Sequence, residues 1–485
     1  MKISHKQIFF LFLCWSLNYL GLSQAPSPIV LSQGKFTSEN KPWFALSVNY
    51  QVDIFTNDET TFWVGPHHSY STNNQRCCQN QTDARMALFA DFARIREMGF
   101  NTIRISGMEL YASNSSVDKK LWTTCKKGLD LENTQLLSSK KNNKILASMV
   151  KVVIEEAHDA GLQVIFLTGG ANIQRNRVQE RYTEWLGELC DTLKTTNPVF
   201  AIDIYNEPVY STSSKLNKAD LHEVTKNWYF TIKKRLPKTL ITIGLIGPED
   251  VTGWDPEALQ IDFVNYHLYP FANDYEYVAS ALYWISQTSK APWIIGETGY
   301  SGSNDSTQNH RQGTETDQKK YALFSLDRAL CRGAQGYSWW AYHDVFWNAV
   351  EDNMGLLNHA GKDKDIVSVF KTFDPSQNPS SCPTPDDLHY YKMEFSDYVI
   401  YGLIENEAGK PIGNAVVCGW DKEWKNFRWT VTDKNGNYRL GSKAPLKFVK
   451  ASATGYSVVN RAIGDANKEI KLNAIILKHW RDLKK

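Results

Sequence analysis

The 485-residue sequence lacks three features that would each indicate a class of function. It has no excess charge, because 54 Lys and Arg residues against 52 Asp and Glu residues leave a net charge of +2, which argues against a nucleic acid partner. It has no Cys–His spacing typical of a zinc site, so we expect no metal and no cofactor. Beyond its first 25 residues it has no apolar run long enough to span a membrane.

The first 25 residues have the pattern of a secretory signal peptide. Lys2, His5 and Lys6 precede an apolar stretch over residues 8–22, and small residues follow it at 23–25. Polar residues interrupt the stretch, so a retained transmembrane helix is the weaker interpretation. We therefore expect a protein that is secreted, to the periplasm or the extracellular space.

Cysteine is scarce in the remainder of the chain, where seven of the eight residues lie. Cys77, Cys78 and Cys125 lie in polar, loop-like sequence and are candidates for one disulfide bridge. Cys190 and Cys331 lie in helical patterns and are expected to be buried thiols. The sequence leaves the pairing open.

Strand and helix patterns alternate over residues 43–373 and predict an α/β domain. Apolar runs indicate eight strands. Six lie at 44–50, 101–105, 163–167, 240–245, 263–268 and 336–341, and the other two are the run Ile-Asp-Ile-Tyr before Asn206-Glu207 and the run Trp293-Ile-Ile-Gly296 before Glu297. Helical patterns lie between them at 83–98, 144–160, 176–196, 219–235, 274–289 and 315–332. This alternation predicts a (β/α)₈ TIM barrel. The long connections 51–82, 106–143 and 342–361 all follow strands, on the side where such a barrel carries its function.

The C-terminal part of the chain predicts a second, all-β domain. A Pro- and Ser-rich segment at 374–394 is typical of a linker. Beyond it, short strand candidates separated by Gly, Asn and Asp predict a small Ig-like or transthyretin-like sandwich over 395–478. The predicted organisation is a signal peptide at 1–25, a barrel domain at 26–373, the linker, the sandwich and a tail at 479–485. We expect a monomer whose sandwich folds independently.

Two glutamates stand at the ends of predicted barrel strands. Glu207 is followed by Pro208 and Glu297 is followed closely by Gly299, and neither following residue continues a strand readily. The catalytic groups of a barrel come from the carboxyl ends of different strands. Paired carboxylates are what the cleavage of a glycosidic bond requires. The ordinary alternative is a pair of surface or helix-capping glutamates.

Four motifs in this order resemble the clan A retaining glycoside hydrolases, and most closely family five, which contains many cellulases and β-mannanases. They are Asn206-Glu207-Pro208, His267-Leu-Tyr269, Glu297 and Trp339-Trp340. The pattern at 402–438 resembles the carboxypeptidase regulatory-like sandwich, which indicates little about chemistry.

The resemblance implies a role for the matched residues. Glu207 would be the acid/base, with a pKa raised by burial and by the second carboxylate. Glu297 would be the ionised nucleophile. Asn206 would bind the sugar 2-hydroxyl, and Tyr269 would donate a hydrogen bond to Glu297.

The resemblance implies further contacts for four more residues. Arg104 would add positive charge beside the nucleophile, with a surface ion pair as the alternative. His267 would lie near the acid/base, with a structural role under the barrel rim as the alternative. Trp339 or Trp340 would stack on the sugar, and we favour Trp339. The sequence departs from the family at residues 168–170, where many members have a histidine and this chain has Thr-Gly-Gly.

We therefore expect a retaining glycoside hydrolase that acts on a β-linked polysaccharide or oligosaccharide, of β-mannan or β-glucan type by analogy. A non-catalytic carbohydrate-binding barrel is the alternative. A metallocarboxypeptidase would need a His-x-x-Glu pair that the barrel segment lacks. In the predicted sandwich, Trp420, Trp424 and Trp429 allow weak polysaccharide or cell-surface binding, and a rigid spacer or stability module is an alternative of at least equal weight.

Overall fold

The computed structural model describes most of the chain, namely residues 26–70, 77–113, 118–208, 216–270, 275–307, 312–346, 351–377, 382–384, 396–424, 426–464 and 468–484. The predicted signal peptide lies outside these residues. Within them, no helix is both long and apolar enough to cross a membrane.

Eight parallel strands form the closed barrel that the sequence predicts. They are β4 (Ala45–Thr56), β6 (Thr102–Ser106), β10 (Gln163–Leu167), β11 (Ala201–Asn206), β12 (Leu240–Leu245), β13 (Val264–His267), β14 (Trp293–Thr298) and β15 (Gly336–Trp339). Each pairs with the next in chain order, and β15 pairs with β4 to close the ring. Their side chains are almost all buried, as in a sheet covered on both faces. The predicted fold class is confirmed.

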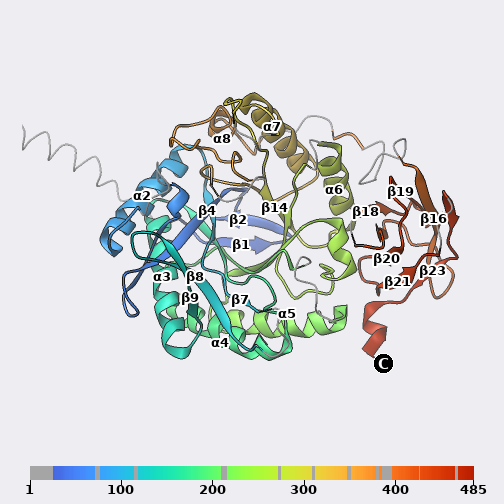
Figure 1. Cartoon of the computed structure of the whole chain (residues 1–485), viewed down its shortest axis with the longest axis horizontal. Helices are drawn as coiled ribbons and strands as arrows, with labels where there is room; N and C mark the ends of the chain where they lie inside the picture. The colour runs from blue at the N-terminus through green and yellow to red at the C-terminus, as the bar shows by residue number, and fades with distance from the viewer. Residues whose placement is uncertain are drawn as a thin grey trace, which may run out of the picture.

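Helices surround the strands (Figure 1). They are α2 (Gln81–Glu97), α3 (Lys140–Asp159), α4 (Asn176–Leu193), α5 (Lys218–Lys233), α6 (Tyr275–Thr288), α7 (Glu315–Cys331) and α8 (Val367–Lys371). Side chains of Asn80, Ser139, Asn217 and Thr314 cap α2, α3, α5 and α7 by accepting backbone N–H groups. After β12, the short 3₁₀ helix η3 (Pro248–Thr252) stands where the barrel pattern would place an α-helix.

Two of the long connections, 51–82 and 106–143, contain strands that the sequence did not predict. β4 runs twelve residues, and its second half pairs with β5 (Phe62–Pro66) and with β8 (Leu121–Lys127). β8 also pairs with β7 (Tyr111–Ala112) and β9 (Glu132–Leu137). These segments are therefore ordered extensions of the sheet rather than loops.

A three-stranded sheet closes the N-terminal end of the barrel. β1 (Ile29–Ser32), β2 (Lys35–Ser38) and β3 (Lys41–Pro42) are antiparallel. Phe36 of β2 is fully buried, and its ring centroid lies 5.3 Å from that of Phe200 and 5.2 Å from that of Phe263. Because this end is sealed by aromatic side chains, the opposite face of the barrel holds the open pocket.

The C-terminal residues form the predicted β-sandwich, beside α5 and α6 in Figure 1. One sheet contains β16 (Tyr398–Asn406), β19 (Asn437–Ser442), β22 (Glu469–Lys471) and β23 (Ile475–Leu477). The other contains β17 (Val416–Trp420), β18 (Arg428–Val431), β20 (Phe448–Ser452) and β21 (Val459–Ala462). The second sheet faces the barrel, since β17 and β20 both contact η3.

A buried polar cluster joins the sandwich to the barrel. The ammonium group of Lys218 on α5 lies 2.8 Å from Asp255 and donates to Ser452 Oγ and the Ala453 carbonyl at 2.9 and 3.2 Å. The Gly455 N–H donates to the same Asp255 oxygen at 2.8 Å. Both charged side chains are at most 1% exposed. The interface between the two domains therefore contains a desolvated ion pair of the barrel, whose hydrogen bonds the sandwich completes.

Two disulfides form among the described residues, and one of them joins two of the three candidate cysteines. Cys77 bonds to its neighbour Cys78, and Cys331 at the end of α7 bonds to Cys382 in the predicted linker. The expectation that Cys331 is a buried thiol is therefore wrong, whereas Cys125 and Cys190 are free and buried.

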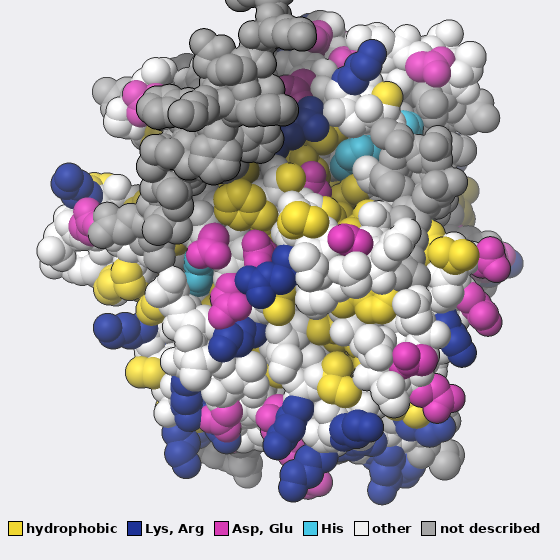
Figure 2. All heavy atoms as spheres, turned by 90° about the vertical axis from the view of Figure 1, so that its left-hand side faces the viewer, with side chains coloured by type: hydrophobic (Ala, Val, Ile, Leu, Met, Phe, Trp, Pro, Cys, Tyr) yellow, Lys and Arg dark blue, Asp and Glu magenta, His cyan; other side chains and the backbone are white. Residues whose placement is uncertain are grey.

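The barrel face opposite the sandwich carries mixed charge (Figure 2). Lys and Arg side chains gather along its lower edge, and Asp and Glu side chains lie among them. This interleaving fits the small net charge of the chain.

Candidate active site

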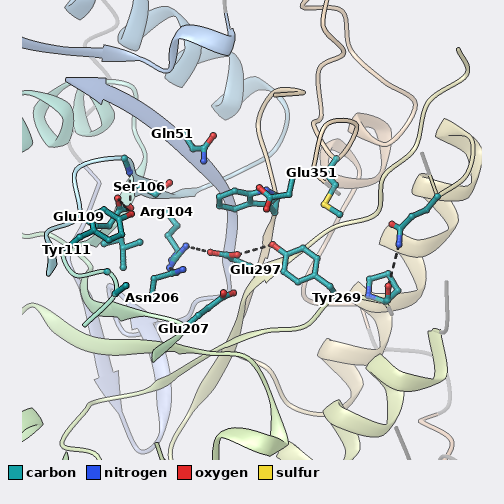
Figure 3. A pocket seen from close by; sticks show the side chains of 18 residues that line it. Gln51, Arg104, Ser106, Glu109, Tyr111, Asn206, Glu207, Tyr269, Glu297 and Glu351 are labelled. Atoms are coloured by element: carbon teal, nitrogen blue, oxygen red, sulfur yellow. Dashed lines mark hydrogen bonds and ion pairs between the residues drawn. The ribbon is translucent and has the colours of Figure 1, made fainter. Parts of the chain in front are cut away.

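A pocket of about 640 Å³ opens at the carboxyl ends of the barrel strands. Most predicted site residues line it. Its lining includes Gln51, Arg104, Glu109, Tyr111, Asn206, Glu207, Tyr269, Glu297, Trp340 and Glu351. Figure 3 shows Glu109 and Tyr111 at one side of the pocket, Glu351 at the other, and Glu207 and Glu297 between them.

Glu297 receives two strong hydrogen bonds. Arg104 donates to Glu297 Oε1 at 2.6 Å, and the Tyr269 hydroxyl donates to Oε2 at 2.9 Å. Glu297 itself is only 6% exposed. A buried carboxylate with a cationic donor on one oxygen and a phenol on the other is held in one orientation.

Arg104 is the centre of a fully buried network. Its Nε donates to Asp203 Oδ2 at 3.0 Å, and its Nη1 donates to Asn49 Oδ1 at 3.0 Å. Its Nη2 donates to Asn206 Oδ1 at 2.8 Å. With the bond to Glu297, the guanidinium group bridges four side chains from three separate strands of the barrel, β4, β11 and β14. The alternative of a surface ion pair is therefore wrong.

Glu207 lies directly after β11 and points into the pocket (Figure 3). Its backbone has a φ of 46°, in the left-handed region that non-glycine residues rarely adopt. Such a conformation is most often retained at functional sites. Glu207 Oε1 lies 2.8 Å from His267 Nδ1, so His267 lies beside the predicted acid/base.

Irregular strand pairing determines the direction in which these side chains point. The register of β11 against β12 shifts between Asp203 and Asn206, and that of β13 against β14 shifts between Tyr266 and His267. A shift of this kind overrides the simple alternation of a strand and re-aims side chains. Asp203 and Asn206, which strict alternation would place on opposite faces, therefore both contact Arg104.

The two glutamates and His267 lie close together. A carboxylate oxygen of Glu207, one of Glu297 and a ring nitrogen of His267 all lie within 4.8 Å of one another. His267 Nδ1 is 3.5 Å from Glu297 Oε1. Two carboxyl groups at this separation can act on the same glycosidic bond, one as proton donor and one as nucleophile.

Electrostatics separates the roles of the two carboxyls. Burial raises the pKa of Glu207 to about 7, with Asp203 adding to the rise and Arg104 opposing it. Burial also raises the pKa of Glu297, against the opposing effects of His267, Arg104 and the Tyr269 hydrogen bond. Two adjacent buried carboxyls hold one proton more readily than none. Because the hydrogen-bond donors surround Glu297, they favour the ionised form of Glu297 over that of Glu207.

His267 is neutral in this site. Burial lowers its pKa to about 4, although Glu297 opposes the change. A neutral imidazole beside Glu207 leaves the carboxylic acid proton in place near pH 7, whereas an imidazolium would draw Glu207 toward the ionised form. His267 therefore supports a protonated Glu207.

The two adjacent tryptophans at the end of β15 divide between core and pocket. Trp340 lines the pocket, and its peptide bond to Ala341 is cis. Trp339 is fully buried, donates from its indole N–H to the Met354 carbonyl at 2.8 Å, and packs against Phe370. The preference for Trp339 as the stacking residue was therefore wrong.

The residues that hold the network carry little signal in the sequence and were missed. Asp203 and Asn49 lie inside apolar strand runs, where a polar residue is the only indication. Asn265 donates to Asp203 Oδ2 at 2.9 Å. Gly296 gives Asn265 its space, because a Cβ there would meet the Asn265 side chain at 1.3 Å. This glycine is needed for close approach and not for its backbone angles.

Tyr111 fills the space beside Gly170, in the segment where the sequence departs from the family. Gly170 lines the pocket, and a Cβ at this position would meet the Tyr111 ring at 2.2 Å. Tyr111 also donates to Glu109 Oε2 at 3.3 Å, and the Gly107 N–H donates to Glu109 Oε1 at 2.8 Å. The space a larger side chain would take after the third strand is therefore filled by an aromatic ring from the preceding connection.

Two clusters among the described residues present metal-ligand atoms to one another. They are Asp53 with His67 and His68, and Glu207 with His267 and Glu297. In the first, His67 Nδ1 accepts the Ser69 N–H at 3.1 Å, which places the ring proton on Nε2 and opposes metal binding there. In the second, Glu297 already binds the Arg104 cation. The donor chemistry of both clusters thus favours hydrogen bonds.

Comparison with known proteins gives one family match. Residues 58–344, more than half of the chain, match the family described as Cellulase (glycosyl hydrolase family 5). No curated protein sequence matches.

Several solved structures are similar to part of this chain at low sequence identity. They include a GH2 beta-galacturonidase from Eisenbergiella tayi (13% identity, TM-score 0.47, covering 71% of this chain and 53% of that one). A beta-D-glucuronidase from Dictyoglomus thermophilum (14%, 0.47, 71% and 52%) and one from Ruminococcus gnavus (12%, 0.47, 71% and 52%) are similar to the same extent. The matched part of this chain spans about half the length of these structures.

Proposed function

Because the chain belongs to the cellulase family, glycosyl hydrolase family 5, and is therefore a glycoside hydrolase, we propose that it cleaves β-glycosidic bonds with retention of anomeric configuration. The observation that carries this proposal is the separation of the carboxylates, whose oxygens lie within 4.8 Å. Retaining enzymes hold the two carboxyls about 5–5.5 Å apart, whereas inverting enzymes need roughly 6.5–9.5 Å to admit water between them.

The proposed mechanism has two steps. In the first, Glu297 attacks the anomeric carbon while Glu207 donates its proton to the leaving glycosidic oxygen, and a covalent glycosyl-enzyme forms. In the second, Glu207, now ionised, removes a proton from water, which attacks the same carbon and releases Glu297. The raised pKa of Glu207 suits the first step, because the group must begin protonated.

The surrounding residues support binding and orientation of the sugar. Tyr269 and Arg104 fix the nucleophile and limit its protonation. Asn206 has its carbonyl oxygen occupied by Arg104, so its amide N–H₂ is the group that would donate to a sugar 2-hydroxyl. Trp340 supplies the aromatic face on which a pyranose ring stacks.

We infer a neutral β-linked polysaccharide or oligosaccharide, of β-mannan or β-glucan type, as the substrate. The family match favours this class. The pocket is lined by two further glutamates, Glu109 and Glu351, besides the catalytic pair. Among the described lining residues the arginine is Arg104, which already forms ion pairs with Glu297 and Asp203. Such an acidic lining favours hydroxyl groups over a carboxylate on the sugar.

We also propose that the protein is secreted. The pattern of residues 1–25 predicts it, and the Cys331–Cys382 disulfide supports it because such bonds persist in oxidising compartments.

The test is a hydrolysis screen on β-mannan, mixed-linkage β-glucan and cellulose oligosaccharides, with the first-formed anomer read by proton NMR. Glu297→Ala should abolish turnover, whereas Glu155→Ala on α3, a glutamate outside the pocket, should leave it unchanged. An inverted first product would refute the assignment of Glu297 as nucleophile.

A further inference from the structure

The sandwich carries a cluster of aromatic side chains at its surface. It consists of Trp420, Trp424, Phe427 and Phe448, which we call the aromatic platform. Trp424 is 62% exposed. Its indole lies flat on Phe448, with centroids 4.5 Å apart and planes at 7°. Trp420 joins the group at 5.8 Å from Trp424 and 5.2 Å from Phe427.

The platform is distinct from the packing between the domains. Trp429, the third tryptophan of this region, is 1% exposed and lies 6.1 Å from the Tyr277 ring of α6. Its role is therefore structural. Trp424, by contrast, rests one face of its indole on Phe448 and presents the rest to solvent. An exposed tryptophan of this kind forms a flat apolar surface that water solvates poorly.

The loop that carries Trp424 is held in place. Asp421 organises it, since its carbonyl accepts the Trp424 N–H at 3.1 Å and its side chain accepts from the Glu423 N–H and the Asn426 amide at 3.0 and 2.6 Å. Trp424 has a φ of 60°, a left-handed conformation that costs about 1–2 kcal/mol for an L-residue. The loop therefore keeps a bulky side chain in an unfavourable backbone state that exposes it.

The platform lies on the sheet that faces the barrel. β17 and β20, which carry Trp420 and Phe448, contact η3. η3 follows β12, and the β12 residue Gly244 accepts the backbone N–H of Glu207 at 2.9 Å. A polymer leaving the pocket on this side of the barrel would thus meet the sandwich.

We propose that the aromatic platform is a second sugar-binding site, which takes a β-linked polysaccharide chain outside the catalytic pocket. The C–H faces of a pyranose ring pack on the open indole of Trp424. Asn426 and Lys450, whose ammonium lies 5.5 Å from the Trp420 ring centroid, supply polar groups for sugar hydroxyls at the rim. Four side chains are too few for a stable protein interface, which needs about 800 Å² on each partner.

This proposal deepens the proposed function and rests on it, since it assumes that the substrate is a polymer. The test uses Glu297→Ala protein in native gels that contain hydroxyethyl cellulose or galactomannan. Adding Trp424→Ala should weaken retardation at least threefold in apparent dissociation constant. Adding Phe230→Ala, which removes an exposed aromatic ring from α5, should not change it. Trp424→Tyr should restore most of the retardation, and circular dichroism checks the fold of each variant.

A kinetic readout separates the platform from the pocket. With Glu297 intact, Trp424→Ala should lower the ratio of kcat/KM on the retarding polymer to kcat/KM on an aryl glycoside. The platform proposal would be overturned, and the proposed function left intact, by either of two results. One is equal retardation of the Trp424→Ala and parent proteins, and the other is no retardation although the protein with Glu297 intact cleaves aryl glycosides. If retardation depends on Trp424 but the protein with Glu297 intact hydrolyses no substrate, the platform is supported and the proposed function is overturned.

Discussion

Tyr269→Phe removes one oxygen atom and tests how the nucleophile is held. The phenol donates to Glu297 Oε2 at 2.9 Å, and Arg104 on the other oxygen at 2.6 Å remains. The ring is retained, so its packing changes little. We expect the free energy of unfolding to change by less than about 1.5 kcal/mol.

Turnover should fall far more than stability. A hydrogen bond to a charged group contributes about 1.5–3 kcal/mol, and the bond to Glu297 must hold the carboxylate ionised and aligned for attack. Its loss corresponds to roughly a ten- to thousandfold fall in kcat/KM, or about 1.4–4 kcal/mol of barrier. Removing a donor from the ionised form also raises the pKa of Glu297 further. The acidic limb of the kcat/KM profile should therefore move to higher pH.

The assay is the pH dependence of kcat/KM on an aryl glycoside, with a urea unfolding curve for the same variant. Tyr300→Phe is the matched control, because Tyr300 lies outside the pocket lining and buries a similar ring. A Tyr269→Phe enzyme that is less stable but fully active, with an unmoved acidic limb, would show that the hydroxyl is structural.

Two further predictions concern the acid/base and the domain interface. The basic limb of the kcat/KM profile should lie near pH 7, because the enzyme loses its proton donor as pH rises through the raised pKa of Glu207. A Glu207→Gln enzyme that keeps this limb would contradict the assignment of Glu207 as the acid/base. Lys218→Met should lower the free energy of unfolding, measured in urea, by about 3–5 kcal/mol, because Asp255 would stay buried without its cation. Lys226 is half-exposed, so the control variant Lys226→Met should lower it by less than about 0.5 kcal/mol. Equal effects of the two variants would show that the interface is hydrated.

The barrel could be predicted from the sequence because its signals are local. Each barrel strand is a short apolar run, and helix periodicity between the runs marks the crossovers. The positions of Glu207 and Glu297 followed from the same reasoning, since Pro208 and Gly299 end their strands. The resemblance of four ordered motifs then indicated the family.

The sequence did not predict contacts that depend on distant partners or on strand register. Asp203 lies 99 residues from Arg104, and nothing around it indicates that an aspartate inside a buried strand binds an arginine. The choice between Trp339 and Trp340 failed because alternation along a strand separates two adjacent side chains but does not show which of them faces the helices. The Cys331–Cys382 bond was missed for a similar reason, since a helical pattern says nothing about what covers the helix end.

The buried cluster between the domains also limits how the two parts can be exchanged. Lys218 and Asp255 belong to the barrel, but Ser452, Ala453 and Gly455 of the sandwich complete their hydrogen bonds. A different sandwich grafted onto this barrel would cover the ion pair without completing its hydrogen bonds, and this sandwich on a barrel without the pair would leave Ser452, Ala453 and Gly455 without these partners. Recombination between relatives should therefore move the barrel and its sandwich as one inherited unit, unlike domains joined only by a flexible tether.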